Sequence, residues 1–240
     1  MQTELRVGEL ARMLGVSGLT IRRDLAELAG KSSIIRTHGG CTAAGRAALE
    51  TEYHKKVAQN FALKQAIGRA AAAEVVPGQV LLINDGSTTY HLASHLEGRG
   101  PLTVYTNSLA MLTDLSRSSN VAVYILGGRY NPDLYSLQGS LAEQVLETLK
   151  IDLCFIGADA VGLDGQCRVT TPEEASLTRT MLRRAARRVL LADHTKVDAG
   201  GPGVAYGSLG DFHLWITTPG IDPGSLETLR RFVTIKEATT

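Results

Sequence analysis

Apolar residues near the N-terminus recur at helical spacing and predict two short helices joined by a tight turn. The first helix is expected over residues 8–14, because three apolar side chains share one of its faces: Leu10, Ala11 and Leu14. Gly15 permits a sharp turn, and Ser17 is a suitable N-cap for a second helix. This pattern is typical of a helix-turn-helix.

The second helix combines an apolar side with a polar side. Its apolar face consists of Ile21, Leu25 and Leu28. Thr20, Arg22 and Arg23 lie on other faces, where they are free to meet a partner. Hydroxyl groups near a helix N-terminus, with guanidinium groups beside them, suit the major groove of DNA. The alternative is a surface helical hairpin whose arginines are only solvated.

A short β-prone run follows the second helix. It spans residues 34–40, carries Arg36 and His38, and ends in a pair of glycines. Such a run suits one arm of a β-wing, which lies along the phosphate backbone and positions a recognition helix. The predicted DNA-binding residues are Ser17, Thr20, Arg22, Arg23, Arg36 and His38.

Beyond residue 60, short apolar runs alternate with helical segments. The runs predicted as strands are residues 80–83, 102–105, 121–126, 153–156, 189–192 and 214–217. Apolar strands separated by helices indicate a mostly parallel sheet that is covered on both faces. This part of the chain is therefore predicted to be an α/β domain.

Small and polar residues follow four of these strands, where ligands of parallel sheets bind. The predicted effector-binding residues are Asp85, Gly86, Ser87, Thr88, Thr89, Thr106, Asn107, Ser108, Gly157, Asp159 and Lys196. In the loop at residues 85–89, a glycine and three hydroxyls precede a helix, which predicts a phosphate or similar anion. An ordinary strand-to-helix connection is the alternative. Lys196 could neutralise the anion, and Asp85 or Asp159 could bind sugar hydroxyls.

Composition narrows the function classes only slightly. Of 240 residues, 44% are hydrophobic and 20% charged, with a net charge of +1, which is ordinary globular composition. Any DNA affinity must therefore come from the placement of charge rather than its amount. The three cysteines have no metal-ligand spacing, and no apolar run approaches the roughly 20 residues that span a bilayer. We expect a cytoplasmic protein with no cofactor, no metal and no membrane contact.

Three further features receive structural interpretations. Glu173 and Glu174 fit a helix N-terminus better than an acid/base pair, because adjacent helical residues point about 100° apart. His91 and His95 have the spacing of metal ligands, but no third ligand is obvious nearby. A basic cluster at helical spacing is expected to be a solvated helix face or an oligomer contact: Arg183, Arg184, Arg187 and Arg188.

Residues 16–25 together with residues 36–40 resemble the winged helix of DeoR-type bacterial transcriptional repressors. Segments across roughly residues 50–235 resemble the sensor domain of the same regulators: residues 63–68, 85–89, 106–108, 127–128, 155–159, 170–175 and 192–196. That fold is similar to the ribose-5-phosphate isomerase and CoA-transferase group. The resemblance implies a phosphorylated sugar or related metabolite as effector.

The chain departs from the family pattern at several positions. Ser32 stands where a glycine is usual, Thr178 where a lysine is frequent, and the order Asp85-Gly86-Ser87 is a variant. The family also carries a helix before residues 6–10 that this sequence does not include. We therefore expect the first helix of the DNA-binding domain to be missing.

These observations predict a winged helix-turn-helix over residues 1–40, a linker over 41–60 and an α/β effector-sensing domain over 61–240. The expected function is a transcriptional regulator, a repressor of sugar metabolism, that binds operator double-stranded DNA as a homo-oligomer under control of a phosphorylated sugar. One alternative is a sugar-phosphate isomerase with Asp85, Asp159, Glu173 and Lys196 as candidate groups. Another is a truncated regulator that binds metabolite but not DNA.

Overall fold

A computed structural model of the 240-residue chain describes residues 5–30, 34–37, 40–43, 52–200 and 203–239. The chain divides into two compact units, Met1–Lys55 and Lys56–Thr240. We call them the winged-helix unit and the sensor unit. Within the described residues, no helix is long and apolar enough to cross a membrane.

The described residues of the winged-helix unit form two helices and a three-stranded antiparallel sheet. Its elements are β1 (Leu5–Arg6), α1 (Val7–Leu14), α2 (Gly18–Gly30), β2 (Ile34–Thr37) and β3 (Gly40–Ala43). The strand order is β1-β3-β2. Gly15 ends α1 in the left-handed region, at φ 65°, which confirms its role in the turn. β3 shows that the wing extends into the range that we expected to be linker.

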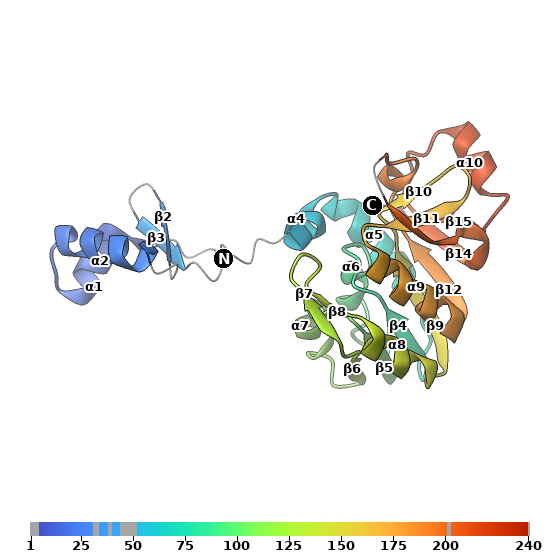
Figure 1. Ribbon diagram of the computed structural model, residues 1–240, viewed down its shortest axis with the longest axis horizontal. Helices are drawn as coiled ribbons and strands as arrows, with labels where there is room; N and C mark the ends of the chain where they lie inside the picture. Colours follow the sequence, from blue (N-terminus) through green and yellow to red (C-terminus); the bar gives the residue numbers. More distant parts are fainter. Residues whose placement is uncertain (1–4, 31–33, 38–39, 44–51, 201–202, 240) are drawn as a thin grey trace. The chain divides into compact units, whose positions relative to one another are not determined.

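The sensor unit is built on a parallel sheet of seven strands. Their order is β15-β14-β12-β9-β4-β5-β6 (Figure 1). These strands are β4 (Val80–Ile83), β5 (Leu102–Thr106), β6 (Val121–Ile125), β9 (Ile151–Gly157), β12 (Ala185–Leu191), β14 (Leu214–Thr217) and β15 (Ile235–Glu237). The six predicted apolar runs all lie in this sheet, whereas the short edge strand β15 was not predicted.

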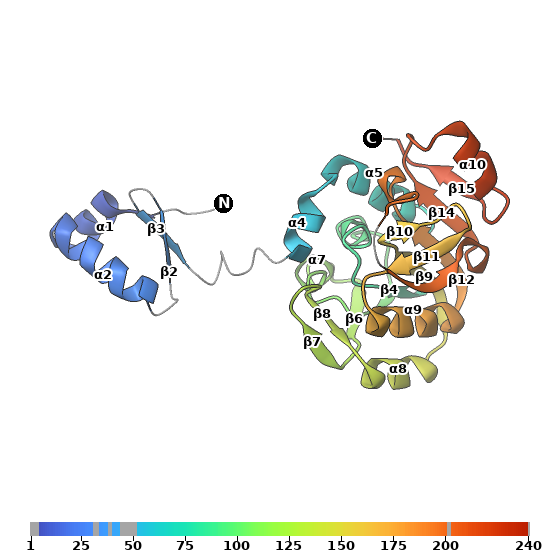
Figure 2. The same cartoon turned by 45° about the horizontal axis from the view of Figure 1, so that its top comes forward.

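Helices cover both faces of the sheet. The helices from Glu52 onward are α4 (Glu52–Ala58), which crosses the boundary between the two units, α5 (Phe61–Ala72), α6 (Tyr90–Ala93), α7 (Leu112–Leu115), α8 (Ser140–Glu147), α9 (Pro172–Arg184) and α10 (Pro223–Leu229). Leu81 and Ile83 of β4 pack in one core with α5, α6 and α7, while Leu82 packs in a second core with α8 and α9. Figure 2 shows α8 and α9 close together. Because successive side chains of a strand point to opposite faces of the sheet, the strands contribute to one core on each face.

Two small antiparallel groups of strands complete the unit. One is the hairpin of β7 (Arg129–Asn131) and β8 (Ser136–Gln138), and the other is β10 (Ala160–Val161), β11 (Gln166–Val169) and β13 (Val204–Ser208). Short helical turns are η1 (His194–Lys196) and η2 (Leu209–Asp211). These strands have two to five residues, too few for a reliable period, and were not predicted.

The basic cluster near residue 185 does not form one helix face, so the helix-face interpretation is wrong, while the oligomer contact stays a prediction. α9 ends at Arg184, and Arg187 and Arg188 lie in β12. Arg187 forms an ion pair with Glu74 at 2.7 Å, and Arg184 donates to the carbonyl of Leu149 at 2.7 Å. These arginines fasten elements of the sensor unit to one another. Trp215 is fully buried in β14.

Candidate DNA-binding and effector sites

In the winged-helix unit, α2 separates buried apolar residues from exposed polar ones. Ile21 and Leu25 are buried against α1. The Ser17 hydroxyl accepts a hydrogen bond from the main-chain N–H of Thr20 at 3.1 Å, which confirms the predicted N-cap. Arg22 and Arg23 are exposed, and Arg23 forms only a solvated ion pair with Asp24 at 3.8 Å. Both guanidinium groups remain accessible to a partner.

The β2–β3 hairpin has the antiparallel register of a wing. Ile34 pairs with Ala43, and Thr37 pairs with Gly40. Arg36 lies in β2 opposite Cys41. His38 lies outside the described residues. The wing that the sequence predicted is therefore present as a strand pair next in sequence to α2.

Two of the predicted effector loops, those after β4 and β9, meet at the topological switch point of the parallel sheet. From β4 the chain builds β5 and β6 on one side, then returns to place β9 on the other side of β4. The connections that follow the neighbouring strands β4 and β9 therefore lead away from each other. α/β proteins bind ligands in the crevice that forms at such a point. The Asn84 side-chain oxygen accepts a hydrogen bond from the N–H of Gly157 at 3.1 Å and joins the two loops.

The loop at residues 85–89 is tightly shaped around Gly86. A Cβ atom at Gly86 would lie 3.1 Å from the Thr89 hydroxyl and 3.3 Å from the Asn84 side-chain oxygen. Thr89 is fully buried, and its hydroxyl donates into the loop, with the carbonyl oxygens of Asn84 and Gly86 each 2.8 Å away. Within the described part of the chain, the main-chain N–H groups of residues 87–89 meet no acceptor. These N–H groups could bind an anion.

The helix after this loop is short. The sequence predicted a helix directly after the loop at residues 85–89, and α6, which follows it, comprises only Tyr90–Ala93. A single turn of helix sums few peptide dipoles. The positive charge that an anion requires must therefore come from side chains.

Lys64 supplies positive charge beside the loop at residues 85–89. It is not among the effector-binding residues predicted from the sequence. The side chain projects from α5 and is only 3% exposed. Its ammonium donates to the Ser87 hydroxyl at 3.1 Å and to the main-chain carbonyl of Lys56. Burial, together with the positive charges of Lys196 and Lys56, lowers the pKa of Lys64 to about 8, against the opposing effect of Asp193 and Asp159.

Lys64 could have been found from the pattern of α5. It lies three, four and seven residues before Ile67, Gly68 and Ala71, which are all buried. A lysine on the buried face of a helix is uncommon unless it is paired, so its position is a functional signal.

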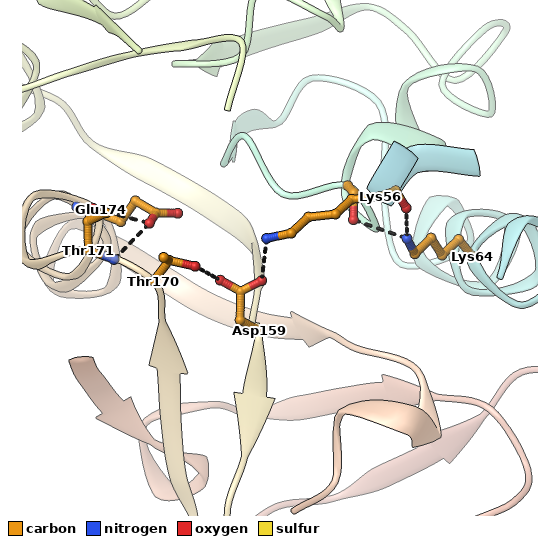
Figure 3. Close-up of polar contacts among 7 residues, drawn as sticks. Lys56, Lys64, Asp159, Thr170, Thr171 and Glu174 are labelled. Carbon is orange, nitrogen blue, oxygen red and sulfur yellow. Dashed lines mark hydrogen bonds and ion pairs between the residues drawn. The ribbon is translucent and has the colours of Figure 1, made fainter. Parts of the chain in front are cut away.

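A polar chain connects α4 with the loop after β9. Figure 3 shows the Lys56 ammonium pointing to Asp159, on the opposite side from Lys64. Lys56 and Asp159 form an ion pair at 3.2 Å, and the Thr170 hydroxyl donates to Asp159 at 2.9 Å. A cavity of about 70 Å³ beside Asp159 is also lined by Arg168 and Thr170 and could hold a few water molecules.

Glu174 faces two other carboxyl groups. It accepts hydrogen bonds from Thr171 at the start of α9, which confirms the predicted helix N-terminus (Figure 3). Burial, together with the negative charges of Asp85 and Asp159, raises the pKa of Glu174 to about 7. Burial also raises the pKa of Asp85, although Ser136 and Asn107 oppose the shift. Glu174 thus joins the site, which the sequence analysis did not predict.

The strand end after β5 is packed against the β7–β8 hairpin. Asn107 donates from its side chain to the carbonyl of Leu137 at 3.2 Å, and Ser108 forms an isolated bridge with Ser136. The remaining predicted residue of this strand end, Thr106, is fully buried and accepts from the N–H of Ser108 at 3.1 Å. Of the predicted effector residues, this group is the most enclosed.

The remaining candidates have structural partners. His95 bonds to Gln65 at 2.8 Å, and His91 bonds to Gln65 and to the carbonyl of Val57. The described residues contain no cluster of three or more side chains able to hold a metal ion. Lys196 is half-buried in η1 and acts electrostatically on Lys64, so it lies near the predicted anion loop.

Comparison with known proteins identifies the family. The model of the DeoR C-terminal sensor domain matches residues 59–218, and that of the DeoR-like helix-turn-helix domain matches residues 1–46. The chain belongs to the DeoR family. It is a DNA-binding transcriptional regulator with a helix-turn-helix and an α/β sensor domain, as its sequence indicated.

Several relatives are similar over most of the chain. The transcriptional regulator GlpR of Haloferax volcanii is 35% identical over 93% of this chain and 87% of its own length. The transcriptional repressor AccR of Agrobacterium fabrum is 31% identical over 80% and 75%, respectively. A putative aga operon repressor of Escherichia coli O157:H7 is 28% identical over 96% and 86%. These names favour a regulator over an isomerase.

Solved structures with partial similarity include ribose-5-phosphate isomerase A from Neisseria gonorrhoeae, with a TM-score of 0.41 and 18% identity over 56% of this chain and 52% of that one. The eIF2B beta subunit of Chaetomium thermophilum has a TM-score of 0.49 and 13% identity over 64% and 47%, respectively.

Proposed function

We propose that this protein is a repressor whose affinity for operator DNA is controlled by a phosphorylated sugar bound in the sensor unit. The buried Lys64 ammonium carries this proposal, because it contacts Ser87 in a loop with unpaired main-chain N–H groups. A buried cation without a full counter-charge is costly, and an anion would offset that cost. A phosphate group fits the loop, with Lys64 and Lys196 as cations.

Polar groups beyond the loop suit the rest of a sugar phosphate. Asp159 is about one-third exposed and already accepts hydrogen bonds, so sugar hydroxyls can replace those donors. Asp85 and Asn107 lie closer to the sheet and are buried. Carboxylate and amide groups of this kind recognise hydroxyls by accepting and donating hydrogen bonds. The ligand class is therefore a polyhydroxylated phosphate monoester.

Repression would follow from homo-oligomerisation, which places two winged helices at a fixed half-site spacing. Arg22 and Arg23 of α2 would contact the major groove, and the β2–β3 wing would follow the phosphate backbone. An effector that favours one quaternary arrangement would change the spacing and thereby the DNA affinity.

The test uses the full chain and an operator selected from a random duplex library. Binding to that duplex is measured with and without pentose 5-phosphates, hexose 6-phosphates and glycerol 3-phosphate. We expect at least one of them to change DNA affinity by about fivefold or more. A selected operator whose binding no sugar phosphate changes would remove the sensor half of the proposal.

The isomerase alternative keeps one specific observation in its favour. Glu174 has a pKa of about 7, near the value that suits general acid/base catalysis. The same sugar phosphates are therefore incubated with the protein and assayed for aldose–ketose conversion. Turnover would support the enzyme, whereas binding without conversion would support the regulator.

A further inference from the structure

The C-terminal end of α4 is held by groups of the proposed effector site. α4 ends at Ala58, and the last carbonyls of a helix have no partner within it. Here the Lys56 carbonyl accepts from Lys64 of α5, and the Val57 carbonyl accepts from His91 of α6 at 3.1 Å. The Lys56 side chain adds the ion pair with Asp159 at 3.2 Å. Three contacts thus fasten this end of α4 within the sensor unit.

The same lysine that holds α4 contacts the anion loop. A lysine ammonium has three N–H donors. Lys64 uses one on the Lys56 carbonyl and one on the Ser87 hydroxyl, so one remains for an anion. An anion on the loop would therefore share a single ammonium with the α4 backbone.

Without an anion, the local charges weaken this attachment. Lys56 and Lys196 both repel Lys64, and the Lys56–Asp159 pair is exposed enough to solvent to contribute little. An added negative charge would screen the repulsion among the three ammonium groups. It would also favour the charged ammonium of Lys64, whose hydrogen bond to the α4 carbonyl is stronger than that of a neutral amine.

We propose that Lys56 and Lys64 couple the effector site to α4, so that a bound anion tightens the attachment of α4 to the sensor unit. This inference rests on the proposed function. α4 is the element through which the chain enters the sensor unit from the winged-helix unit. Fixing the end of α4 therefore fixes the point at which the chain leaves the sensor unit toward the DNA-binding unit. By this means a bound effector changes the affinity for operator DNA.

The first experiment measures hydrogen exchange of the segment at residues 52–60 in the full-length protein. The probe is whichever sugar phosphate is shown by calorimetry to bind; inorganic phosphate is used in parallel. We expect a saturating probe to slow exchange of this segment by about threefold or more. A probe that binds but leaves the exchange unchanged, or speeds it, overturns the inference while the proposed effector site stands.

The second experiment measures the coupling factor, the ratio of operator dissociation constants with and without saturating probe. Lys56→Gln removes the Asp159 ion pair but keeps the main-chain carbonyl, and we expect it to reduce the factor by about threefold or more. The matched control is Lys236→Gln, which removes a lysine–glutamate pair with Glu74 elsewhere in the sensor unit. It should leave the factor unchanged. An unaltered factor in Lys56→Gln would overturn the inference.

Lys64→Gln tests the shared ammonium directly. We expect it to speed exchange of residues 52–60 even without the probe, because the Lys56 carbonyl loses its donor. Slow exchange in a folded Lys64→Gln protein would contradict the inference. If this variant does not fold, the hydrogen exchange of the wild-type protein and the coupling factor of Lys56→Gln still test the inference. If neither a sugar phosphate nor inorganic phosphate binds to the protein, the result contradicts the proposed function instead.

Discussion

Glu174 lies in the first turn of α9, where it both caps the helix and faces two carboxyl groups. Its pKa is raised from 4.5 to about 7, so the folded protein binds this proton more tightly than the unfolded chain. Protonation of Glu174 therefore contributes to the free energy of unfolding below pH 4.5, and this contribution is lost as the pH rises through about 7. Glu174→Gln keeps a cap-forming amide and removes the charge.

We therefore expect Glu174→Gln to raise the free energy of unfolding by about 1–3 kcal/mol above pH 7, and to give no gain below pH 4.5. Denaturant unfolding on the acidic and alkaline sides of that range measures both values. The control is Glu173→Gln, an exposed neighbour that should change stability by less than about 0.5 kcal/mol. Equal effects of the two variants would contradict the assignment.

Lys64 makes anion binding depend on pH. Its pKa of about 8 means that the ammonium loses its proton in mildly alkaline solution, while Glu174 gains negative charge above about pH 7. The neighbouring charges are Lys56, Lys196, Asp159, Asp193 and Asp85. A phosphate monoester is already mostly dianionic at pH 7. Effector affinity should therefore fall about five- to tenfold from about pH 7 to about pH 9.

Calorimetric titration across this pH range measures the fall. In Lys64→Gln the affinity should be lower throughout and should no longer decline above about pH 8, because the titrating ammonium is absent. A wild-type affinity that is constant or rises with pH would show that Lys64 does not bind the anion.

At the scale of elements, α5 and α6 approach so closely that only glycine fits at their crossing. A Cβ atom on Gly68 of α5 would lie 2.5 Å from the main-chain oxygen of His91 in α6. The obstacle is backbone, which cannot turn aside, so Gly68→Ala should destabilise the sensor unit by about 1–3 kcal/mol. Thermal unfolding of the full chain measures this loss.

Gly8→Ala is the matched control. Gly8 also lies in a helix, but no atom lies within 4 Å of where its Cβ would be. The same substitution should therefore stabilise α1 by up to about 1 kcal/mol through helix propensity. If Gly68→Ala were equally harmless, the close approach of α5 and α6 would be refuted.

At the scale of the whole molecule, DNA affinity depends on a few exposed side chains of the winged-helix unit. We expect Arg22→Gln combined with Arg23→Gln to weaken operator binding by at least about fivefold and to flatten its dependence on salt. Fluorescence anisotropy at several salt concentrations gives both quantities. Arg231→Gln removes an equally exposed arginine of the sensor unit and should change neither. Unchanged affinity in the double variant would exclude α2 as the recognition helix.

Local patterns allowed most of the architecture to be predicted. The spacing of Ile21 and Leu25 predicted a buried helix face, and uninterrupted apolar runs predicted the parallel sheet. The β7–β8 hairpin was missed because its three-residue strands are too short to show a period. Arg187 and Arg188 were assigned to a helix because spacing alone does not reveal where α9 ends and β12 begins.

The sequence by itself determined the helix-turn-helix, the wing, the α/β class and the polar loops at the strand ends, because each depends on residues close together in the chain. Only the tertiary structure brought Lys56 to Asp159, 103 residues away, and set Lys64 beside Ser87. It also decided which charges are buried, and therefore the pKa values of Lys64 and Glu174. Crossover connections create these neighbours, and neither periodicity nor composition records them.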